Sequence, residues 1–229
     1  PGLGNFKLGQ LLYNVREVEA MQASLGGEKY TGEQATREQF LKALAGNSVF
    51  HLSAHSLYND RSPLSSAIYF SSSSATEAVE GDDALFAFEI YARKIDAELG
   101  ILTSCDSGFG AYRTGEGLVS LRRAFYFAGC RSLVASLWQA NDRATFEVAR
   151  KFGEQLALEK TKDEALRNAK LEVMKENPAY RHPFYWANLT LSGTRNPLKP
   201  QASKLWLYII LSTVALTFFI VVLKRRKSS

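Results

Sequence analysis

Two apolar strings in this chain, residues 49–54 and 100–104, have the composition of buried strands and constrain its fold more than any other feature. A reactive side chain ends each string: His55 ends the first, and Cys105 ends the second, 50 positions later. In an open parallel sheet, the carboxyl ends of neighbouring strands face the crevice where ligands bind. The sequence therefore predicts an imidazole and a thiol at one sheet edge, the minimum for a thiolate nucleophile.

Helical patterns alternate with these strands, and strands separated by helices indicate an α/β fold with a mostly parallel sheet and helices on both faces. Apolar residues make up 46% of the chain, enough for a globular core. The expected helices cover residues 14–25, 36–45, 88–97, 115–128, 143–158 and 162–175, and the expected strands cover 49–54, 67–70, 100–104, 132–137 and 184–191. Three helices carry a capping pair at their start. The pairs are Asn14 and Glu17, Thr36 and Gln39, and Thr161 and Glu164.

The C-terminal end has a different composition. Residues 205–223 contain no charged side chain, and a helix of that length, at about 1.5 Å per residue, nearly spans a hydrocarbon core of about 30 Å. We therefore expect a single transmembrane helix there, after a linker over 194–204; a buried helix of a soluble protein is the alternative. The basic tail, 224–229, supplies most of the net charge of +5, so the charge does not indicate nucleic acid binding. Basic residues on both flanks leave the membrane orientation open.

Cys105 and Cys130 are the two cysteines of the chain. Cys105 is expected at the exit of its strand and Cys130 at the entrance of the next, which places them about 17–20 Å apart in a parallel pair. A disulfide requires Cα atoms within about 7 Å, so we expect none and interpret Cys130 as a small buried residue. His51 is expected to be a hydrogen-bonded core residue, although a supporting role at the site is possible, and His182 is expected to be structural. The spacing of these residues indicates no metal site.

An ordered series of short motifs runs through residues 12–193. The motifs are HLSAHS around His55, EIY at 89–91, LTSCDSG around Cys105, GEGL at 115–118, RAFYFAG at 123–129, SLWQANDRAT at 136–145, ALRNAK at 165–170 and HPFYW at 182–186. In this order and spacing they make the chain resemble the CHAT family of caspase-like cysteine peptidases. A His about 50 residues before a Cys is also the caspase order.

The resemblance implies a caspase-like three-layer sandwich over residues 1–193, with the N-terminal part of the domain missing from this chain. It implies cleavage of peptide bonds by a Cys–His dyad, in which His55 matches the general base and Cys105 the nucleophile. It also implies tetratricopeptide repeats upstream, as the receptor for an activating protein partner. No cofactor is required.

In the implied mechanism, the backbone N–H groups of Ser56 and Cys105 hold the oxyanion. Caspase-type sites usually have Gly after the catalytic His, whereas this chain has Ser56; because Ser also has an N–H group, the contact is retained. Thr103 and Ser104 precede the nucleophile where many family members have Ser and Ala. We expect this small polar change to be tolerated.

Loops at the same sheet edge are expected to select the substrate, with Asp106, Trp138 and Asp142 in the pocket. Either carboxylate could bind a basic side chain before the scissile bond, because a buried charge needs a partner. Arg113 and Arg143 lie in the same loops and could instead select an acidic side chain or pair with the Asp residues. We take the basic side chain as the expectation.

Two other classes of function are alternatives to a peptidase. A catalytically silent caspase-like domain could anchor its upstream repeats at the membrane as a scaffold, although the presence of both His55 and Cys105 at strand ends favours catalysis. A nucleotide-binding domain would need a Gly-rich turn, and the pair Gly108 and Gly110 lacks the full pattern. The sequence therefore predicts a single-pass, membrane-anchored cysteine endopeptidase that acts on a protein or peptide substrate.

Overall fold

A computed structural model describes residues 12–46, 48–57, 59, 61–71, 83–103, 116–138 and 141–199. The chain divides into two compact units, Pro1–Leu198 and Lys199–Ser229, and the elements described here belong to the first. Its helices are α1 (Asn14–Leu25), α2 (Arg37–Leu44), α3 (Ala87–Tyr91), α4 (Glu116–Ala128), α5 (Asp142–Ala157), α6 (Lys162–Glu176) and α7 (Pro183–Trp186). Its strands are β1 (Val49–Leu52), β2 (His55–Leu57), β3 (Ala67–Tyr69), β4 (Ala84–Phe86), β5 (Leu99–Leu102), β6 (Ser132–Ser136) and β7 (Leu189–Gly193).

The central sheet has the strand order β1-β5-β6-β7. β1, β5 and β6 run parallel to one another, whereas β7 is antiparallel to β6. Every residue of β5 and β6 is buried, as expected for strands that are covered on both faces. The predicted mostly parallel sheet is confirmed.

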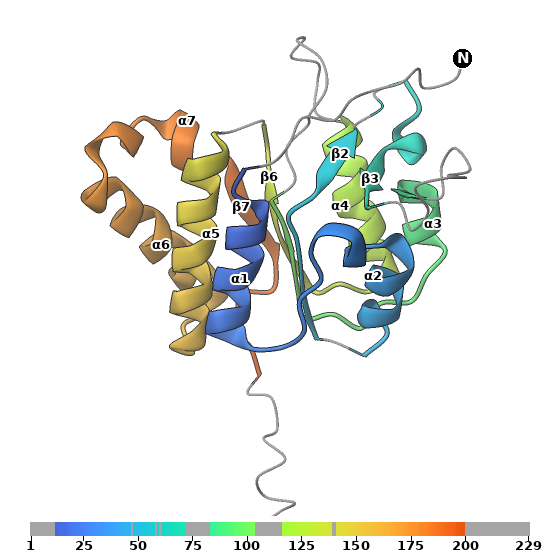
Figure 1. The fold of residues 1–229 in the computed structure, drawn as a ribbon, viewed down its shortest axis with the longest axis horizontal. Coiled ribbons are helices and arrows are strands. Elements are labelled where there is room, and N and C mark those ends of the chain that lie inside the picture. Colours follow the sequence, from blue (N-terminus) through green and yellow to red (C-terminus); the bar gives the residue numbers. More distant parts are fainter. Residues whose placement is uncertain are drawn as a thin grey trace, which may run out of the picture. The chain divides into compact units, whose positions relative to one another are not determined.

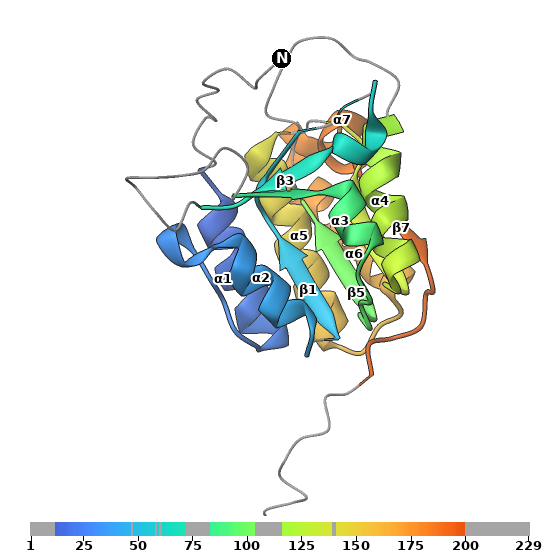
Figure 2. The ribbon, with the colours of Figure 1, turned by 90° about the vertical axis from the view of Figure 1, so that its right-hand side faces the viewer.

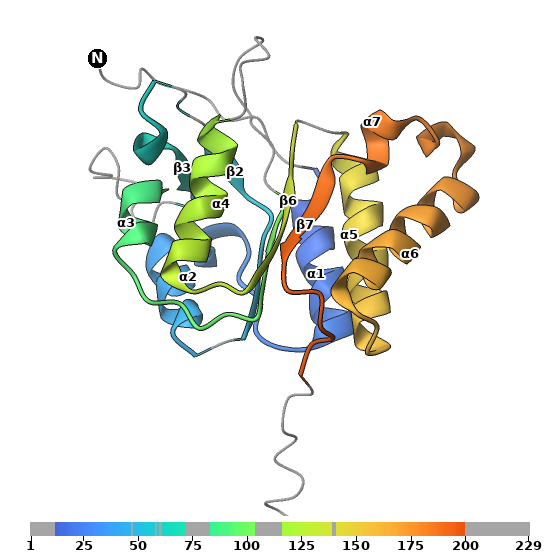
Figure 3. The same ribbon diagram turned by 180° about the vertical axis from the view of Figure 1, so that it is seen from behind.

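Helices form a layer on each face of this sheet. α1, α5 and α6 lie on one face, and α2, α3 and α4 lie on the other, as Figure 1 and the view from behind in Figure 3 show. Successive residues of β5 feed the two cores, because side chains alternate between the faces of a strand. The core facing α5 and α6 includes Met21, Leu99, Ile101, Val134, Phe152 and Leu166, and the core facing α2 and α4 includes Phe40, Phe50, Leu52, Leu102, Phe125 and Leu133. The predicted three-layer arrangement is confirmed.

A second, antiparallel sheet with the order β2-β3-β4 continues from the carboxyl end of β1 (Figure 2). We predicted that His55 ends the strand over 49–54, but β1 ends at Leu52 and His55 begins β2. The reason is a change of pairing partner, since β1 pairs with β5 while β2 pairs with β3. The predicted strand over 67–70 is confirmed as β3.

The predicted helix over 88–97 is wrong in its extent. The chain first forms β4, and α3 then covers Ala87–Tyr91 alone. Glu89 accepts the Phe86 N–H at 2.9 Å, which fixes the start of the helix directly after the strand. The residues after α3 lead back to the sheet, where the Ile95 N–H donates to the Ala128 carbonyl.

The predicted strand over 184–191 is also wrong, because it begins as helix α7 and the strand β7 starts at Leu189. Pro183 occupies the first turn of α7, where its missing N–H is not needed. His182 Nδ1 accepts the Phe184 N–H at 3.2 Å and caps this helix. The structural role predicted for His182 is therefore confirmed.

One of the three predicted capping pairs has the expected cap. The Thr36 hydroxyl accepts the Gln39 N–H at 3.2 Å. α1 and α6 begin without a side-chain cap, so the predictions for Asn14 and Thr161 are wrong. Glu17 does not cap α1 because its side chain is buried against the sheet, with 1% of the residue exposed.

Residues 194–198, which we expected to be linker, pack against the domain. The backbone N–H of Lys162 donates to the Arg195 carbonyl at 2.8 Å, and its Nζ donates to the Asn196 carbonyl at 2.9 Å. Because β7 ends beside the start of β6, this segment lies at the amino-terminal edge of the parallel strands. The unit therefore ends opposite the edge at which β1 and β5 end.

The predicted transmembrane helix, residues 205–223, and the basic tail, residues 224–229, lie outside the described residues. Among the helices that are described, none combines the length and the apolar composition needed to cross a membrane. The membrane anchor therefore stays a prediction.

Candidate active site

β1 and β5 pair with a constant offset of 50 residues, from Val49 with Leu99 to Leu52 with Leu102. The ladder continues by one bond, in which the Thr103 N–H donates to the Leu52 carbonyl at 3.1 Å. We call the carboxyl ends of these two strands the strand exits. His55 follows Leu52 by three residues along the chain, and Cys105 follows Leu102 by three residues. Cys105 and its neighbours Ser104 and Asp106 lie outside the described residues.

The register of the small sheet directs the backbone of Ser56. The Phe70 N–H donates to the Asp83 carbonyl, so Phe70 directs its backbone toward the chain that leads into β4. In an antiparallel sheet, hydrogen-bonded pairs recur at every second residue, so Ile68, two residues earlier, also directs its backbone N–H and carbonyl toward β4. Ser56 lies opposite Ile68, so its N–H faces away from β3, on the outer side of β2. Ser56 is fully buried, and its hydroxyl has no hydrogen-bond partner among the described residues. This orientation is compatible with the predicted oxyanion contact.

A buried polar cluster joins the two strand exits to α1. Glu17 Oε1 lies 2.7 Å from His51 Nε2, and the Thr103 hydroxyl donates to the same carboxylate oxygen. Thr103 Oγ1 also lies 3.3 Å from His51 Nε2 and 3.2 Å from the Leu52 carbonyl oxygen. His51 Nδ1 has no hydrogen-bond partner in the described part of the chain. The prediction that His51 is a hydrogen-bonded core residue is confirmed.

Trp138 and Asp142 follow β6 at the same edge of the sheet. The Trp138 indole N–H donates to the Phe184 carbonyl at 3.2 Å. Asp142 begins α5, and its Oδ2 accepts the backbone N–H groups of Leu12 and Tyr13 at 3.1 Å each. This carboxylate therefore holds the start of α1. The roles of Trp138 and Asp142 in substrate binding stay predictions.

The family model of the CHAT domain matches residues 3–194 of this chain. The chain belongs to the CHAT domain family. Among curated proteins it is similar to tetratricopeptide repeat protein 28 of Mus musculus and of Homo sapiens, each 25% identical over 217 residues. These alignments cover 82% of this chain, which spans 9% of the length of either relative. A crystal structure of the Arg-specific cysteine proteinase gingipain R is similar with a TM-score of 0.48 and 13% identity, over 82% of this chain and 42% of that one.

The second cysteine of this CHAT domain is buried, as predicted. Cys130 is 2% exposed, and its thiol donates to the Ser132 carbonyl at 3.1 Å. Burial raises the pKa of the Cys130 thiol to about 11, because the thiolate would lose its hydration. Such a thiol is a poor nucleophile at neutral pH. Cys130 also precedes β6, at the amino-terminal edge of the sheet, whereas the strand exits lie at the other edge.

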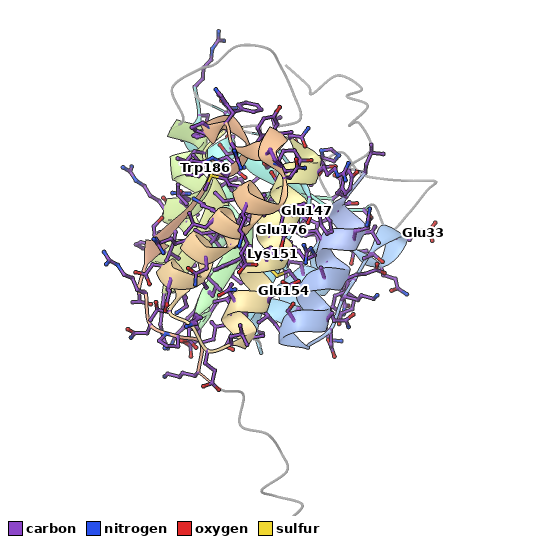
Figure 4. All side chains as sticks on the ribbon, turned by 90° about the vertical axis from the view of Figure 1, so that its left-hand side faces the viewer. Glu33, Glu147, Lys151, Glu154, Glu176 and Trp186 are labelled. Carbon is purple, nitrogen blue, oxygen red and sulfur yellow. The ribbon has the colours of Figure 1, made fainter. Side chains whose placement is uncertain are left out.

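Charged side chains on α5 and α6 form ion pairs between these helices. Lys151 Nζ lies 3.1 Å from Glu172 and 2.7 Å from Glu176, and Figure 4 shows Lys151 and Glu176 side by side. These contacts join two helices of the outer layer, so we assign them a structural role. In the ranges that the structure describes, no group of three or more His, Cys, Asp or Glu side chains could hold a metal ion.

A hollow of about 340 Å³ lies beside Trp186, whose position Figure 4 labels. Leu166, Leu171 and Met174 of α6 line it, together with Leu191 of β7. β7 is the edge strand farthest from β1 in the sheet order. The hollow is therefore separate from the strand exits and is not part of the candidate active site.

The interpretation of the sequence missed Glu17 as a partner of His51 and Thr103. It assigned Glu17 to helix capping, because the residue lies three positions after Asn14. A signal was present, since Glu17 and Met21 are four residues apart and such residues share one face of a helix. Met21 belongs to the core, so a carboxylate on the same face needed a buried partner.

Proposed function

We propose that this CHAT domain is a cysteine endopeptidase with a Cys105–His55 dyad. The supporting observation is the register of β1 and β5, in which both residues follow the last pair, Leu52 with Leu102, by three positions. Neighbouring strands are spaced by about 4.8 Å, so chains that leave from one registered pair begin close together. We infer from this common origin that the imidazole and the thiol come within reach of a hydrogen bond.

In the proposed reaction, His55 accepts the thiol proton of Cys105, and the thiolate attacks the peptide carbonyl. The N–H groups of Ser56 and Cys105 donate to the oxyanion that forms, and the outward direction of the Ser56 N–H supports this assignment. The imidazolium then protonates the leaving amine. Water, deprotonated by His55, hydrolyses the thioester and restores the thiol.

We propose a basic side chain before the scissile bond, with Asp106 as its ionic partner and Trp138 in the same pocket. Asp142 is a weaker candidate for this contact than Asp106, because its Oδ2 already accepts two backbone N–H groups. An acidic side chain bound by Arg113 or Arg143 is the alternative that the experiment below separates.

We also propose that residues 205–223 anchor the enzyme in a membrane as a single span. The domain ends at the amino-terminal edge of the sheet, so the connection to that segment starts away from the strand exits. Tetratricopeptide repeats appear in the name of the curated relatives, which supports a repeat region upstream. That region would receive the activating protein partner.

Covalent labelling tests the dyad. The full-length protein in detergent is treated with peptidyl acyloxymethyl ketones that carry a basic or an acidic residue next to the reactive ketone, and adducts are read by intact mass. We expect one adduct, which is lost in Cys105→Ala and strongly slowed in His55→Ala. Cys130→Ala is the matched control and should label as the parent does. Faster labelling by the basic probe would support Asp106 as the ionic partner.

The opposite result has a defined meaning. If the protein with its upstream region and a candidate activator forms no adduct, the peptidase proposal fails. The domain would then be a silent scaffold that anchors a repeat protein at the membrane. An adduct that persists in Cys105→Ala would equally contradict the proposed nucleophile.

A further inference from the structure

Glu17 is a carboxylate in a place where a carboxylate is costly. It is 1% exposed, between α1 and the central sheet, on the face where Leu99 and Ile101 form the core. A buried carboxylate without hydrogen-bond partners is strongly destabilising. Here two donors, His51 Nε2 and the Thr103 hydroxyl, converge on one oxygen of Glu17. The proposed reaction uses none of these three side chains.

The cluster lies at the junction between the two strand exits. His51 belongs to β1, and Thr103 is the residue directly after β5. Thr103 also contacts the Leu52 carbonyl through both its N–H, at 3.1 Å, and its hydroxyl, at 3.2 Å. Along the chain, Thr103 precedes Cys105 by two residues and Leu52 precedes His55 by three. Among the described residues, the cluster therefore holds the last contact between the strands that lead to the proposed dyad.

Glu17 is itself held in place through α1. Asp142, at the start of α5, accepts the N–H groups of Leu12 and Tyr13, and the Glu17 N–H donates to the Tyr13 carbonyl at 2.9 Å. The Tyr13 ring also stacks on Phe146 of α5 at 5.6 Å. The start of α1 is thus tied to the helix that follows β6. The Glu17 carboxylate is therefore held from α5 as well as from β1 and the end of β5.

We propose that Glu17, His51 and Thr103 form a positioning cluster that sets the separation of the strand exits, and through it the distance between His55 and Cys105. The role of the cluster in catalysis rests on the proposed function, while its role in holding the exits does not. Reacting groups must lie within a narrow range of distance, and a displacement of about 1 Å can slow a reaction about 100-fold. Thr103 is the central residue, because its hydroxyl donates to the Glu17 carboxylate of α1 and its N–H donates to the Leu52 carbonyl of β1.

The test compares Thr103→Val, which has nearly the same shape but no hydroxyl, with Thr103→Ser, which keeps the hydroxyl. Labelling of the full chain by the preferred acyloxymethyl ketone is measured as kinact and KI, well below the melting temperature of each variant. We expect kinact to fall about 10-fold to 100-fold in Thr103→Val, with KI nearly unchanged, and to recover in Thr103→Ser. Ser132→Ala is the matched control. It removes a buried hydroxyl, bonded to Thr194, at the opposite sheet edge, and kinact should stay at the parent value.

A second variant covers the case in which Thr103→Val does not fold. Glu17→Gln keeps the size of the side chain and an acceptor oxygen but removes the charge, so the bonds from His51 and Thr103 weaken without leaving a cavity. We expect kinact to fall in this variant as well, by less than in Thr103→Val. Equal values of kinact in the parent, Glu17→Gln and Thr103→Val would overturn the proposal.

Hydrogen exchange separates this proposal from the dyad itself. If the parent forms no adduct with the ketone, the peptidase proposal fails, and the cluster is judged by amide exchange alone. We expect the amides of residues 52–57 and 99–103 to exchange faster in Thr103→Val than in the parent, while those of β6 and β7 are unchanged. Exchange that is the same at the exits in both proteins would refute the positioning role, whatever the result of labelling.

Discussion

Cys130 should resist alkylation in the folded protein, which makes single-site labelling of Cys105 interpretable. At about pH 8, a thiol with a pKa of about 11 is about 0.1% ionised, against about 24% for an unfolded cysteine with a pKa of about 8.5. The fraction of thiolate is therefore about 240-fold lower in the folded protein than in the unfolded one. The more basic thiolate is about tenfold more nucleophilic, which offsets part of this difference. Together, the lower thiolate fraction and the higher nucleophilicity slow alkylation of folded Cys130 about 20-fold. Because Cys130 is 2% exposed, a reagent reaches it after local opening, which slows the reaction further.

The measurement uses Cys105→Ala, in which Cys130 is the remaining thiol. Iodoacetamide is added to the folded protein and, in parallel, to the same protein in urea, and the mass increase is followed with time. We expect alkylation to be at least about 20-fold slower in the folded protein. A folded-state rate within about fivefold of the unfolded rate would refute the reasoning, because neither the raised pKa nor the burial would then protect the thiol.

Two further predictions concern the elements that surround the site. Gly129→Ala should destabilise the protein by about 3–5 kcal/mol in urea unfolding, because φ is +115° and a Cβ would lie 2.2 Å from the Ile95 carbonyl oxygen. Gly26→Ala is its control for backbone strain without a clash, since Gly26 has φ of +73° and ψ of −161°, a region essentially limited to glycine, and open space around the added Cβ; it should cost about 1–3 kcal/mol, and equal losses would show that the Ile95 contact is relieved at no cost. Asp142→Ala should cost about 1–3 kcal/mol by releasing the N–H groups of Leu12 and Tyr13, and Asp142→Asn, which keeps an acceptor, should cost less. Neither Asp142 variant should change the preference between basic and acidic probes, and a selective rise in KI for the basic probe would instead place Asp142 in the substrate pocket.

The layers and most of the elements could be predicted from the sequence, because burial on both faces leaves a clear pattern. β5 and β6 are buried along their whole length, and the corresponding strings contain no charged residue. α4 and α5 begin within one residue of the predicted starts. The spacing of 50 residues between His55 and Cys105 also equals the offset of the β1–β5 register. The two residues therefore follow the β1–β5 pair by the same number of positions.

The errors occur where a short element depends on partners far away in the sequence. The change from β1 to β2 requires β3, which lies more than ten residues later, and no local pattern around His55 indicates it. α7 replaces the start of a predicted strand because Pro183 and the His182 cap favour a turn of helix over the apolar run that follows. Glu17 was misassigned because its partners, His51 and Thr103, are 34 and 86 residues away. When a side chain is buried, its contacts with distant residues determine its position, and a local capping pattern does not predict them.

The change of sheet after Leu52 determines how a His–Cys pair can be held in this fold. His55 is positioned by the pairing of β2 with β3, through Tyr69, whereas the chain that leads to Cys105 is positioned by β5 in the central sheet. A shift of one sheet relative to the other would change the distance between imidazole and thiol. The bonds of Thr103 to Leu52 and Glu17 lie at this junction, and breaking them would leave buried polar groups without partners, at about 1–3 kcal/mol each. The buried carboxylate, which the core does not need, is thus accounted for by the need to hold β1 and β5 together at the point where the chain leaves the central sheet.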